Sequence, residues 1–370
     1  MKMNKQKRIL FITDTFGYGG AEKQLAFVAE GLLNRGHVVG ICNLNAIKRN
    51  EGQREIDQRV ILYSADINYR NAIQTNYDYV VFVRKCAKGF KPDVIVGFKQ
   101  LAGFCASVVG KLLRVPSIFS ERADPFRAYA SINFTSRLKL WFINRATGGV
   151  FQTEQAASFY SKHIQKNSEV IPNPVFLKGK VQAKDYSTLP KTVVSLGRIA
   201  NEQKRLDITL DAFEMFRKYH PDYQLKIYGN GGDEALVRKW IVEKGLEDSV
   251  RMMGVSNDPI ADLSREGIFL LTSDYEGISN ALLEAMACGL PVVSTDHTPG
   301  GARLLIEDGN NGLLVPMGDA DAVCRALRLY AEDLSLAERC GRNAQNVVEK
   351  FSPESILGKW ESFLLSNCKQ

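Results

Sequence analysis

Residues 273–294 read SDYEGISNALLEAMACGLPVVS, and this stretch predicts one complete loop–helix–strand unit. The apolar run directly before it is typical of a buried strand. Ser279 or Asn280 can cap a helix whose body consists mainly of Ala, Leu, Glu and Met, which are strong helix formers. Gly289 favours the end of that helix, Pro291 prevents its continuation, and the Val-Val-Ser that follows predicts the next strand.

Two carboxylates lie around the start of this helix. Glu276 stands in the loop before it, and Glu284 follows about one turn inside. The first backbone N–H groups of a helix have no partner within the helix and carry a partial positive charge. We therefore predict a site for an anionic group between the two acids, lined by Gly277, Ile278, Ser279 and Asn280.

The spacing Glu276-x7-Glu284, followed by AMACGLPVV, resembles the signature of retaining glycosyltransferase family 4. The resemblance extends over nearly the whole chain and is strongest in residues 192–316. A Ser-Glu-Arg string at residues 120–122 is similar to the subset that acts on bacterial surface polysaccharides or lipid-linked glycans. The resemblance implies an α/β protein of GT-B fold, with two doubly wound Rossmann-like domains that face each other across a cleft.

The length of 370 residues suggests two domains, and 45% hydrophobic with 24% charged residues is typical of a soluble globular protein. With the resemblance, we expect an N-terminal acceptor-binding Rossmann-like domain at 1–175. A C-terminal nucleotide-sugar-binding Rossmann-like domain follows at 176–350, and a C-terminal helix at 351–370 crosses back to the first domain. Within the first domain, the Asn- and Asp-rich residues 64–78 predict a loop before a helix at 79–88.

The rarer residue types indicate a cytoplasmic protein. Seven cysteines are scattered without a C-x-x-C pair, which favours reduced thiols over disulfides or a zinc site. The histidines lack metal-ligand spacing and are expected at surface or hydrogen-bonded positions; they are His37, His163, His220 and His297. The first apolar run is too short for a signal peptide, and no apolar stretch reaches the ~18 residues of a membrane-spanning helix.

Charge is distributed unevenly along the chain. Residues 1–175 contain 25 Lys and Arg against 13 Asp and Glu, a net charge of +12, whereas the remainder has a net charge of −5. Solvated surface is one explanation, and an anionic partner of the basic half is the other: a membrane or an acceptor that carries pyrophosphate. Residues 131–145 combine Arg137, Lys139 and Arg145 with Trp141. Such a helix either lies on the inner face of the cytoplasmic membrane or packs into the core with its cations extended to solvent.

A glycine-rich turn, DTFGYGGAE at residues 14–22, follows the first strand. It is not a dinucleotide fingerprint, because G-x-G-x-x-G requires glycine where Glu22 stands, and Asn43 replaces the acid expected after the second strand. Gly19 and Gly20 can let the backbone approach a phosphate or sugar closely, and a tight turn alone is the alternative. In the family that the chain resembles, this loop lies under the donor diphosphate and beside the acceptor.

Arg122 occupies a position where the family commonly carries a histidine near the transferred sugar. Arginine cannot accept a proton, so the histidine role does not carry over directly. We keep Arg122 as a candidate catalytic residue. The alternative is an ion-pair cluster that Arg122 forms with Glu121 and Asp124.

The second half contains a candidate diphosphate clamp. Arg198 and Lys204 lie in a polar loop after the predicted strand at 192–196, and they resemble the family's diphosphate-binding pair. Arginine supplies a planar fork and lysine a mobile point charge, and both suit the oxygens of a nucleoside diphosphate. Two merely exposed cations are the alternative. Gly229 and Val255 follow two further strands, where the nucleotide base is expected.

The remaining acidic motif does not predict a metal site. Asp319-Ala-Asp321 is a D-x-D string, but it stands at a helix start, where Asp is a favoured cap. The resemblance implies a metal-independent enzyme with no cofactor, in which the nucleotide-sugar is a substrate. Leu304 stands where the family usually has an acid, so this chain lacks the contact that the acid would make.

Together these residues predict a retaining glycosyltransferase that moves a hexose or N-acetylhexosamine from a nucleotide-sugar, in particular a UDP-sugar. The acceptor is a glycan or lipid-linked saccharide of polysaccharide biosynthesis, and no nucleic-acid partner is expected. Glu284 would bind the ribose diol and Glu276 the donor hexose. Glu276, Arg198, Lys204 and Arg122 are the candidate catalytic residues. Two alternatives remain: a GT-B nucleotide-sugar epimerase, which needs no acceptor, and a catalytically silent nucleotide-sugar-binding subunit.

Overall fold

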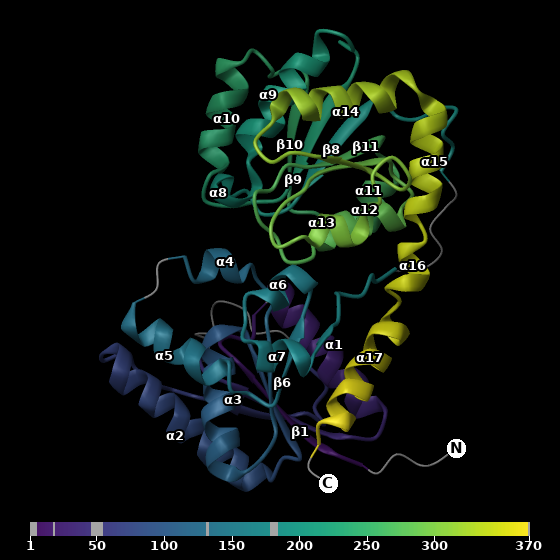
Figure 1. Cartoon of the computed structure of the whole chain (residues 1–370). Helices are drawn as coiled ribbons and strands as arrows, with labels where there is room; N and C mark the ends of the chain where they lie inside the picture. The colour runs from purple at the N-terminus through teal and green to yellow at the C-terminus, as the bar shows by residue number, and fades with distance from the viewer. Residues whose placement is uncertain (1–5, 18, 46–54, 131–132, 178–183, 369–370) are drawn as a thin grey trace. The chain divides into compact units, whose positions relative to one another are not determined.

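The computed structural model describes residues 6–17, 19–45, 55–130, 133–177 and 184–368. The chain forms two α/β units, each built on a parallel sheet (Figure 1). Unit 1 comprises Met1–Asn173 together with Glu354–Gln370, and unit 2 comprises Pro174–Pro353. The predicted class, two doubly wound α/β domains, is confirmed.

Unit 1 has a sheet with the strand order β3-β2-β1-β4-β5-β6-β7, in which every pair is parallel. Its strands are β1 (Arg8–Thr13), β2 (Val38–Asn43), β3 (Ile61–Ser64), β4 (Val94–Phe98), β5 (Ser117–Ser120), β6 (Gly148–Phe151) and β7 (Ser168–Val170). Its helices are α1 (Gly20–Asn34), α2 (Ala72–Phe90), α3 (Lys99–Leu113), α4 (Pro125–Ala128), α5 (Phe134–Ile143), α6 (Glu154–Ser158), α7 (Lys162–Lys166) and α17 (Pro353–Ser366).

Helices cover both faces of this sheet. On one face, Leu10 and Ile12 of β1 pack into the core that α2 and α3 complete, and α5 packs on α3. On the other face, the ring of Trp360 from α17 is fully buried and stacks on Phe98 at 5.7 Å. Alternate side chains of a strand point to opposite faces, so β1 serves both layers. Because the connections of parallel strands are right-handed, the direction in which the chain moves along the sheet decides which face each helix covers.

The predicted loop at 64–78 is wrong over its second half, because α2 begins at Ala72. The side chain of Asn71 caps the helix by accepting a hydrogen bond from the backbone N–H of Gln74 at 2.9 Å. Among residues 72–78 only Thr75 is buried. The usual apolar stripe of a core-facing helix is therefore missing from this first half, and the sequence pattern does not reveal it.

Unit 2 has a parallel sheet with the strand order β10-β9-β8-β11-β12-β13. Its strands are β8 (Thr192–Leu196), β9 (Gln224–Tyr228), β10 (Val250–Gly254), β11 (Ile268–Leu271), β12 (Val292–Thr295) and β13 (Leu313–Val315). Its helices are α8 (Asn201–Lys204), α9 (Leu206–Arg217), α10 (Glu234–Glu243), α11 (Pro259–Ser264), α12 (Asn280–Ala287), α13 (Gly301–Leu305), α14 (Ala320–Glu332), α15 (Leu334–Ala344) and α16 (Val347–Lys350).

The strand order of unit 2 reverses at β8, which has β9 on one side and β11 on the other. Chain segments that leave the carboxyl ends of β8 and β11 therefore emerge next to each other. In open parallel sheets this switch point is where ligands bind. The two segments contain the predicted diphosphate clamp and the first acid of the E-x7-E motif.

Candidate functional site

The helix predicted from the E-x7-E motif is α12, and Ser279 is its N-cap. The Oγ atom of Ser279 accepts a hydrogen bond from the backbone N–H of Leu282 at 3.4 Å. The loop before the helix is fixed by its backbone, because the N–H of Glu276 donates to the carbonyl of Thr298 at 2.9 Å. A Cβ atom on Gly301 would lie 1.8 Å from the carbonyl oxygen of Gly277, so these two segments meet at van der Waals distance.

Two residues predicted separately, Lys204 and Glu276, form an ion pair in the structure. Their side chains are only 13% and 12% exposed. Ser273 Oγ donates a second hydrogen bond to the same Glu276 oxygen at 3.1 Å. The Nζ atom of Lys204 also lies 3.0 Å from the position of a Cβ on Gly197, so a larger residue at 197 would displace the lysine. The carboxylate thus neutralises the cation of the candidate clamp.

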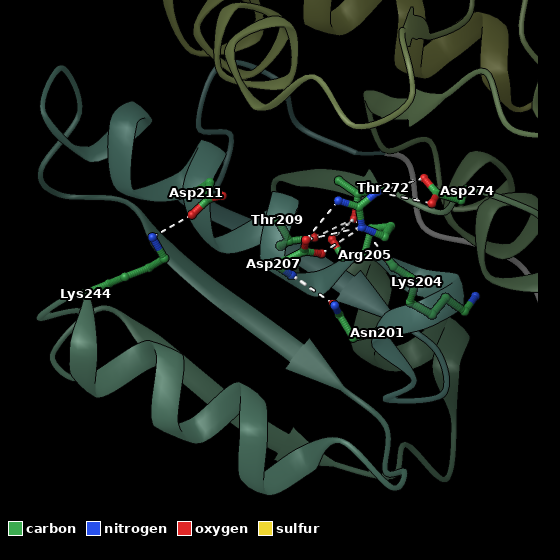
Figure 2. A network of polar contacts seen from close by, with 9 residues as sticks. All are labelled: Asn201, Lys204, Arg205, Asp207, Thr209, Asp211, Lys244, Thr272 and Asp274. Atoms are coloured by element: carbon green, nitrogen blue, oxygen red, sulfur yellow. Dashed lines mark hydrogen bonds and ion pairs between the residues drawn. The ribbon is translucent and has the colours of Figure 1, made fainter.

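Arg205 connects the loop of Lys204 to the loop of Glu276 (Figure 2). Its guanidinium donates two hydrogen bonds to Asp207, from Nε at 3.0 Å and from a terminal nitrogen at 2.9 Å. The other terminal nitrogen donates to Asp274 at 3.1 Å. Arg205 has the left-handed backbone conformation, with φ 51° and ψ 52°, which is unfavourable for a residue with a Cβ. We call Arg205, Asp207 and Asp274 the Arg205 bracket.

Backbone contacts support this bracket. The Thr272 hydroxyl contacts the carbonyl oxygens of Lys204 at 2.9 Å and of Arg205 at 3.0 Å. The backbone N–H of Asp274 donates to the carbonyl of Gln203 at 2.9 Å. The position of Lys204 over Glu276 is therefore set by two loops that hold each other, not by the lysine side chain alone.

Three of the other predicted donor-site residues of unit 2, Arg198, Gly229 and Val255, follow the carboxyl ends of β8, β9 and β10. Gly229 has φ +136°, and a Cβ there would lie 1.8 Å from the carbonyl oxygen of Gly197, so only glycine fits. Arg198 and Val255 are exposed, and Glu284 is half-buried on α12. The structure thus gathers Lys204, Glu276 and Gly229 around Gly197. Contacts of all these residues with a donor stay predictions.

His297 lies beside the candidate site, and the sequence reasoning did not single it out. Its Nδ1 atom contacts the carbonyl oxygen of Thr298 at 3.4 Å, so the expected hydrogen-bonded position is met at one ring nitrogen. The histidine follows β12, is 1% exposed, and its Nε2 atom has no hydrogen-bond partner among the described residues. Its Cε1 atom lies 3.1 Å from the position of a Cβ on Gly301. Burial lowers the pKa of His297, against the opposing charge of Glu276. A single histidine after a strand forms no recognisable motif with other residues. The only feature of the sequence that could have pointed to His297 is its place just before Pro299-Gly300-Gly301.

In unit 1, the glycine-rich turn contacts a buried carboxylate. A Cβ on Gly19 would lie 2.3 Å from an oxygen of Glu22, and Gly20 is the first residue of α1. Glu22 pairs with Lys99 at 2.7 Å. Burial opposes its ionisation, but the hydrogen bond and charge of Lys99 prevail and lower the pKa of Glu22. The turn therefore leaves space for an internal ion pair, and its approach to a donor stays a prediction.

Asp14 is a second acid at this edge that the sequence reasoning did not single out, and its side chain is half-buried. Its carboxylate accepts a hydrogen bond from the backbone N–H of Ala102 at 3.0 Å. Burial raises the pKa of Asp14 to about 6, against the lowering effect of Lys99. The signal available in the sequence was its place directly after the first strand.

Arg122 lies among aromatic rings in unit 1. Its guanidinium carbon is 5.3 Å from the ring centre of Phe98 and 5.1 Å from that of Trp360, and its Nε donates to Ser120 Oγ at 2.9 Å. Burial lowers the pKa of Arg122 to about 9. Glu121 accepts hydrogen bonds from Tyr160 at 2.6 Å and from the backbone N–H groups of Arg122 and Ala123, and its charge opposes the lowering of the pKa of Arg122. These contacts tie α17 to the sheet, and a role at the reacting sugar stays a prediction.

Other features of the described residues bear on the class of site. No group of three or more His, Cys, Asp or Glu that could hold a metal ion occurs among them. All seven cysteines are buried and none forms a disulfide. Asp319 caps α14 by accepting from the N–H of Ala322 at 2.8 Å, as predicted. Over the same described ranges, every helix is too short or too polar to cross a bilayer.

Comparison with known proteins gives two family matches that together span most of the chain. The "Glycosyltransferase Family 4" model matches residues 18–178, and the "Glycosyl transferases group 1" model matches residues 181–347. An uncharacterized glycosyltransferase of Haemophilus influenzae is 23% identical over 363 residues, 96% of this chain and 98% of that protein. The poly(ribitol-phosphate) alpha-N-acetylglucosaminyltransferase of Staphylococcus aureus is 31% identical over 219 residues, 59% of this chain but only 43% of that protein.

The fold is shared with solved structures. Anabaena HepE, crystallised in complex with UDP, superposes with a TM-score of 0.78 at 19% identity, over 97% of this chain and 100% of that one. At this identity the likeness shows the fold alone.

Proposed function

Because the chain belongs to the family 4 glycosyltransferases of GT-B fold, we propose that it is a retaining enzyme that uses a UDP-sugar. It transfers a hexose or N-acetylhexosamine to a glycan or lipid-linked saccharide in bacterial polysaccharide biosynthesis. Unit 2 binds the donor and unit 1 the acceptor. The relatives support the donor class, because HepE was crystallised with UDP and the Staphylococcus aureus relative is named for N-acetylglucosaminyl transfer.

The observation that supports this proposal most is the Lys204–Glu276 pair beside the start of α12. A nucleoside diphosphate sugar presents a negative diphosphate next to neutral hydroxyls. A lysine suits the first and a carboxylate accepts hydrogen bonds from the second. In this proposal the donor takes over both partners: Lys204 turns to the phosphate, and Glu276 to the hexose.

The remaining residues surround this pair. Arg198 and the backbone around Gly277, Ile278, Ser279 and Asn280 complete the diphosphate site, and Glu284 binds the ribose diol. Gly229 and Val255 border the base. Within unit 1, Gly19, Gly20 and Arg122 are our candidates for substrate contacts. Negative charge develops on the leaving phosphate during transfer, and preorganised cations and N–H dipoles stabilise it. No metal or cofactor takes part, so a chelator is expected to leave activity unchanged.

Thermal-shift measurements with UDP, GDP, ADP and their sugars test the donor class. A ligand at ~100 times its Kd stabilises the folded state by ~2.7 kcal/mol, and only the correct base is expected to do so at moderate concentration. We expect Lys204→Ala and Glu284→Gln to lose the UDP shift, since a charge-assisted contact contributes ~1.5–3 kcal/mol. Lys244→Ala is the matched control, because Lys244 is ion-paired with Asp211 elsewhere in unit 2 (Figure 2). Full UDP binding by both site variants would refute the proposal.

Product analysis separates the activities. Incubation with the donor alone is expected to leave the sugar configuration unchanged, whereas an epimerase would alter it. Transfer that needs an acceptor excludes a silent binding subunit. We also propose that the enzyme works in the cytoplasm at the membrane surface, where lipid-linked acceptors are presented.

A further inference from the structure

Helix α5 of unit 1 has an outer apolar face that no described part of the fold covers. Phe134, Leu138 and Trp141 recur at the i, i+4, i+7 spacing of one helix face, and they are 76%, 43% and 45% exposed. A hollow of about 750 Å³ lies over this face, lined by Phe134, Arg137, Leu138, Trp141 and Phe142. We call Phe134, Leu138 and Trp141 the α5 face.

The fold does not need these three side chains, because α5 packs on the unit through other residues. Phe142 meets Phe104 of α3 edge-to-face, with ring centres 5.6 Å apart. Ile143 is fully buried, and Leu140 packs against the same core. A helix that already has a buried side and still exposes three large apolar residues in one stripe is typical of an interaction surface.

The charged residues along this part of the chain are of one sign. Residues 125–153 contain four Lys and Arg and no Asp or Glu. The guanidinium of Arg145 lies 3.7 Å above the Trp141 ring and donates to the Trp141 carbonyl at 2.9 Å. Arg137 lines the same hollow. An aromatic belt with flanking cations is the composition that suits the boundary between lipid headgroups and acyl chains.

Helix α2 repeats this arrangement on the same side of the sheet. Its exposed residues Ile73, Tyr77 and Val81 are spaced by four, and the positive residues Arg84, Lys85 and Lys88 follow them. Both α2 and α5 pack on α3, and Figure 1 shows the three helices in one layer. The outer surface of this layer therefore carries two apolar stripes with cations.

We propose that this helical layer of unit 1 docks on an anionic bilayer, with the α5 face inserted among the headgroups and Arg137 and Arg145 on lipid phosphates. A second copy of the chain fits less well, because a two-fold interface would bring the same cations against each other. The inference deepens the peripheral location proposed above and is independent of the donor contacts in unit 2. It identifies the partner as a lipid surface and not a free anion, because binding a soluble phosphate would leave the apolar stripe exposed to water.

Vesicle sedimentation with the full-length chain tests this docking. We expect binding to vesicles of phosphatidylglycerol and phosphatidylcholine at low salt, little binding to phosphatidylcholine alone, and a blue shift of Trp141 fluorescence. Arg137→Ala and Arg145→Ala should each weaken partitioning about five-fold, as expected for one cation near an anionic surface. The double variant Phe134→Ser, Trp141→Ser should weaken it more than ten-fold, roughly the effect of removing a few buried CH₂ groups.

Tyr219→Ala is the matched control, since Tyr219 is an exposed aromatic of unit 2 with Arg328 3.9 Å above its ring. It should bind vesicles like the unaltered chain. Equal binding by the α5 variants, or no anionic preference, would overturn the proposal. So would a change in sedimentation coefficient that shows the α5 face pairing two copies. The UDP thermal shift of the α5 variants reports separately on the donor site, so a failure of one proposal is distinguishable from a failure of the other.

Discussion

Replacing Arg205 by alanine and by glycine separates the two effects of the Arg205 bracket. Both changes delete the hydrogen bonds to Asp207 and Asp274. They differ in the backbone, because Arg205 has φ 51° and a Cβ in that conformation costs about 1 kcal/mol or more. Alanine keeps that cost, whereas glycine removes it.

The structure sets the expected magnitudes. The side chains of Arg205, Asp207 and Asp274 are partly exposed, so solvent screening limits each ion pair to roughly 0.5–1 kcal/mol. Arg205→Ala should therefore lower the free energy of unfolding by about 1–2 kcal/mol. Arg205→Gly should lower it by about half as much. Glycine adopts the left-handed conformation without cost, which offsets part of the loss, and the greater backbone entropy of glycine in the unfolded state prevents a full recovery.

Binding of UDP should respond differently. The bracket fixes the loop that carries Lys204, so both variants leave that cation less well positioned for a phosphate. A partial loss of one charge-assisted contact, about 1 kcal/mol, weakens UDP binding about five-fold, and equally in both variants. Urea unfolding measures the stabilities and calorimetric titration the affinities. Arg238→Ala is the control, because its pair with Glu234 is exposed and lies within one helix.

Two outcomes would contradict this reasoning. If the glycine variant is no more stable than the alanine variant, the backbone of Arg205 is not strained. If both variants lose stability but bind UDP as the unaltered chain does, the bracket holds unit 2 together without positioning Lys204.

Three further predictions concern burial. Gly229→Ala should unfold unit 2 or destabilise it by several kcal/mol, because the added Cβ would overlap the Gly197 carbonyl oxygen. Gly232→Ala is the control and should leave the melting temperature nearly unchanged, because there is open space around its Cβ. Thermal melting of the two variants makes the comparison. Asp14→Asn should raise the free energy of unfolding at pH 8 by about 3 kcal/mol, because the folded pKa of Asp14 is about 6 against a usual value of 3.8 and folding therefore penalises the ionised carboxylate. Urea titrations should show the gain shrinking below pH 6 and vanishing near pH 4. The pKa of His297 is lower in the folded chain than in the unfolded chain, so the unfolded chain binds the proton at higher pH. The free energy of unfolding should therefore fall as the pH drops below 6.5. Between pH 7.5 and pH 5.5, His297→Asn should lose less unfolding free energy than the unaltered chain.

The sequence predicted the elements around the site better than the contacts within it. The cap at Ser279, the extent of α12 and the helix start at Asp319 follow from local residue preferences, so the pattern of residues was sufficient. The Lys204–Glu276 pair joins residues 72 positions apart, and only the folded sheet brings their loops together. Asp14 and His297 carry no spacing signal, because their surroundings come from distant segments. The early start of α2 was missed since the side chains of its first turns face away from the core.

The return of α17 to unit 1 has a consequence for synthesis of the chain. Residues 1–173 leave the ribosome about 180 residues before Trp360 can reach Phe98 and Arg122. At a translation rate of roughly 5–20 residues per second, this pocket of aromatic and cationic groups stays uncovered for about ten to forty seconds. Unit 2 is continuous in sequence and can complete its sheet within that interval. Unit 1 therefore begins to form first but is completed last, and until then the aromatic residues that α17 covers are exposed.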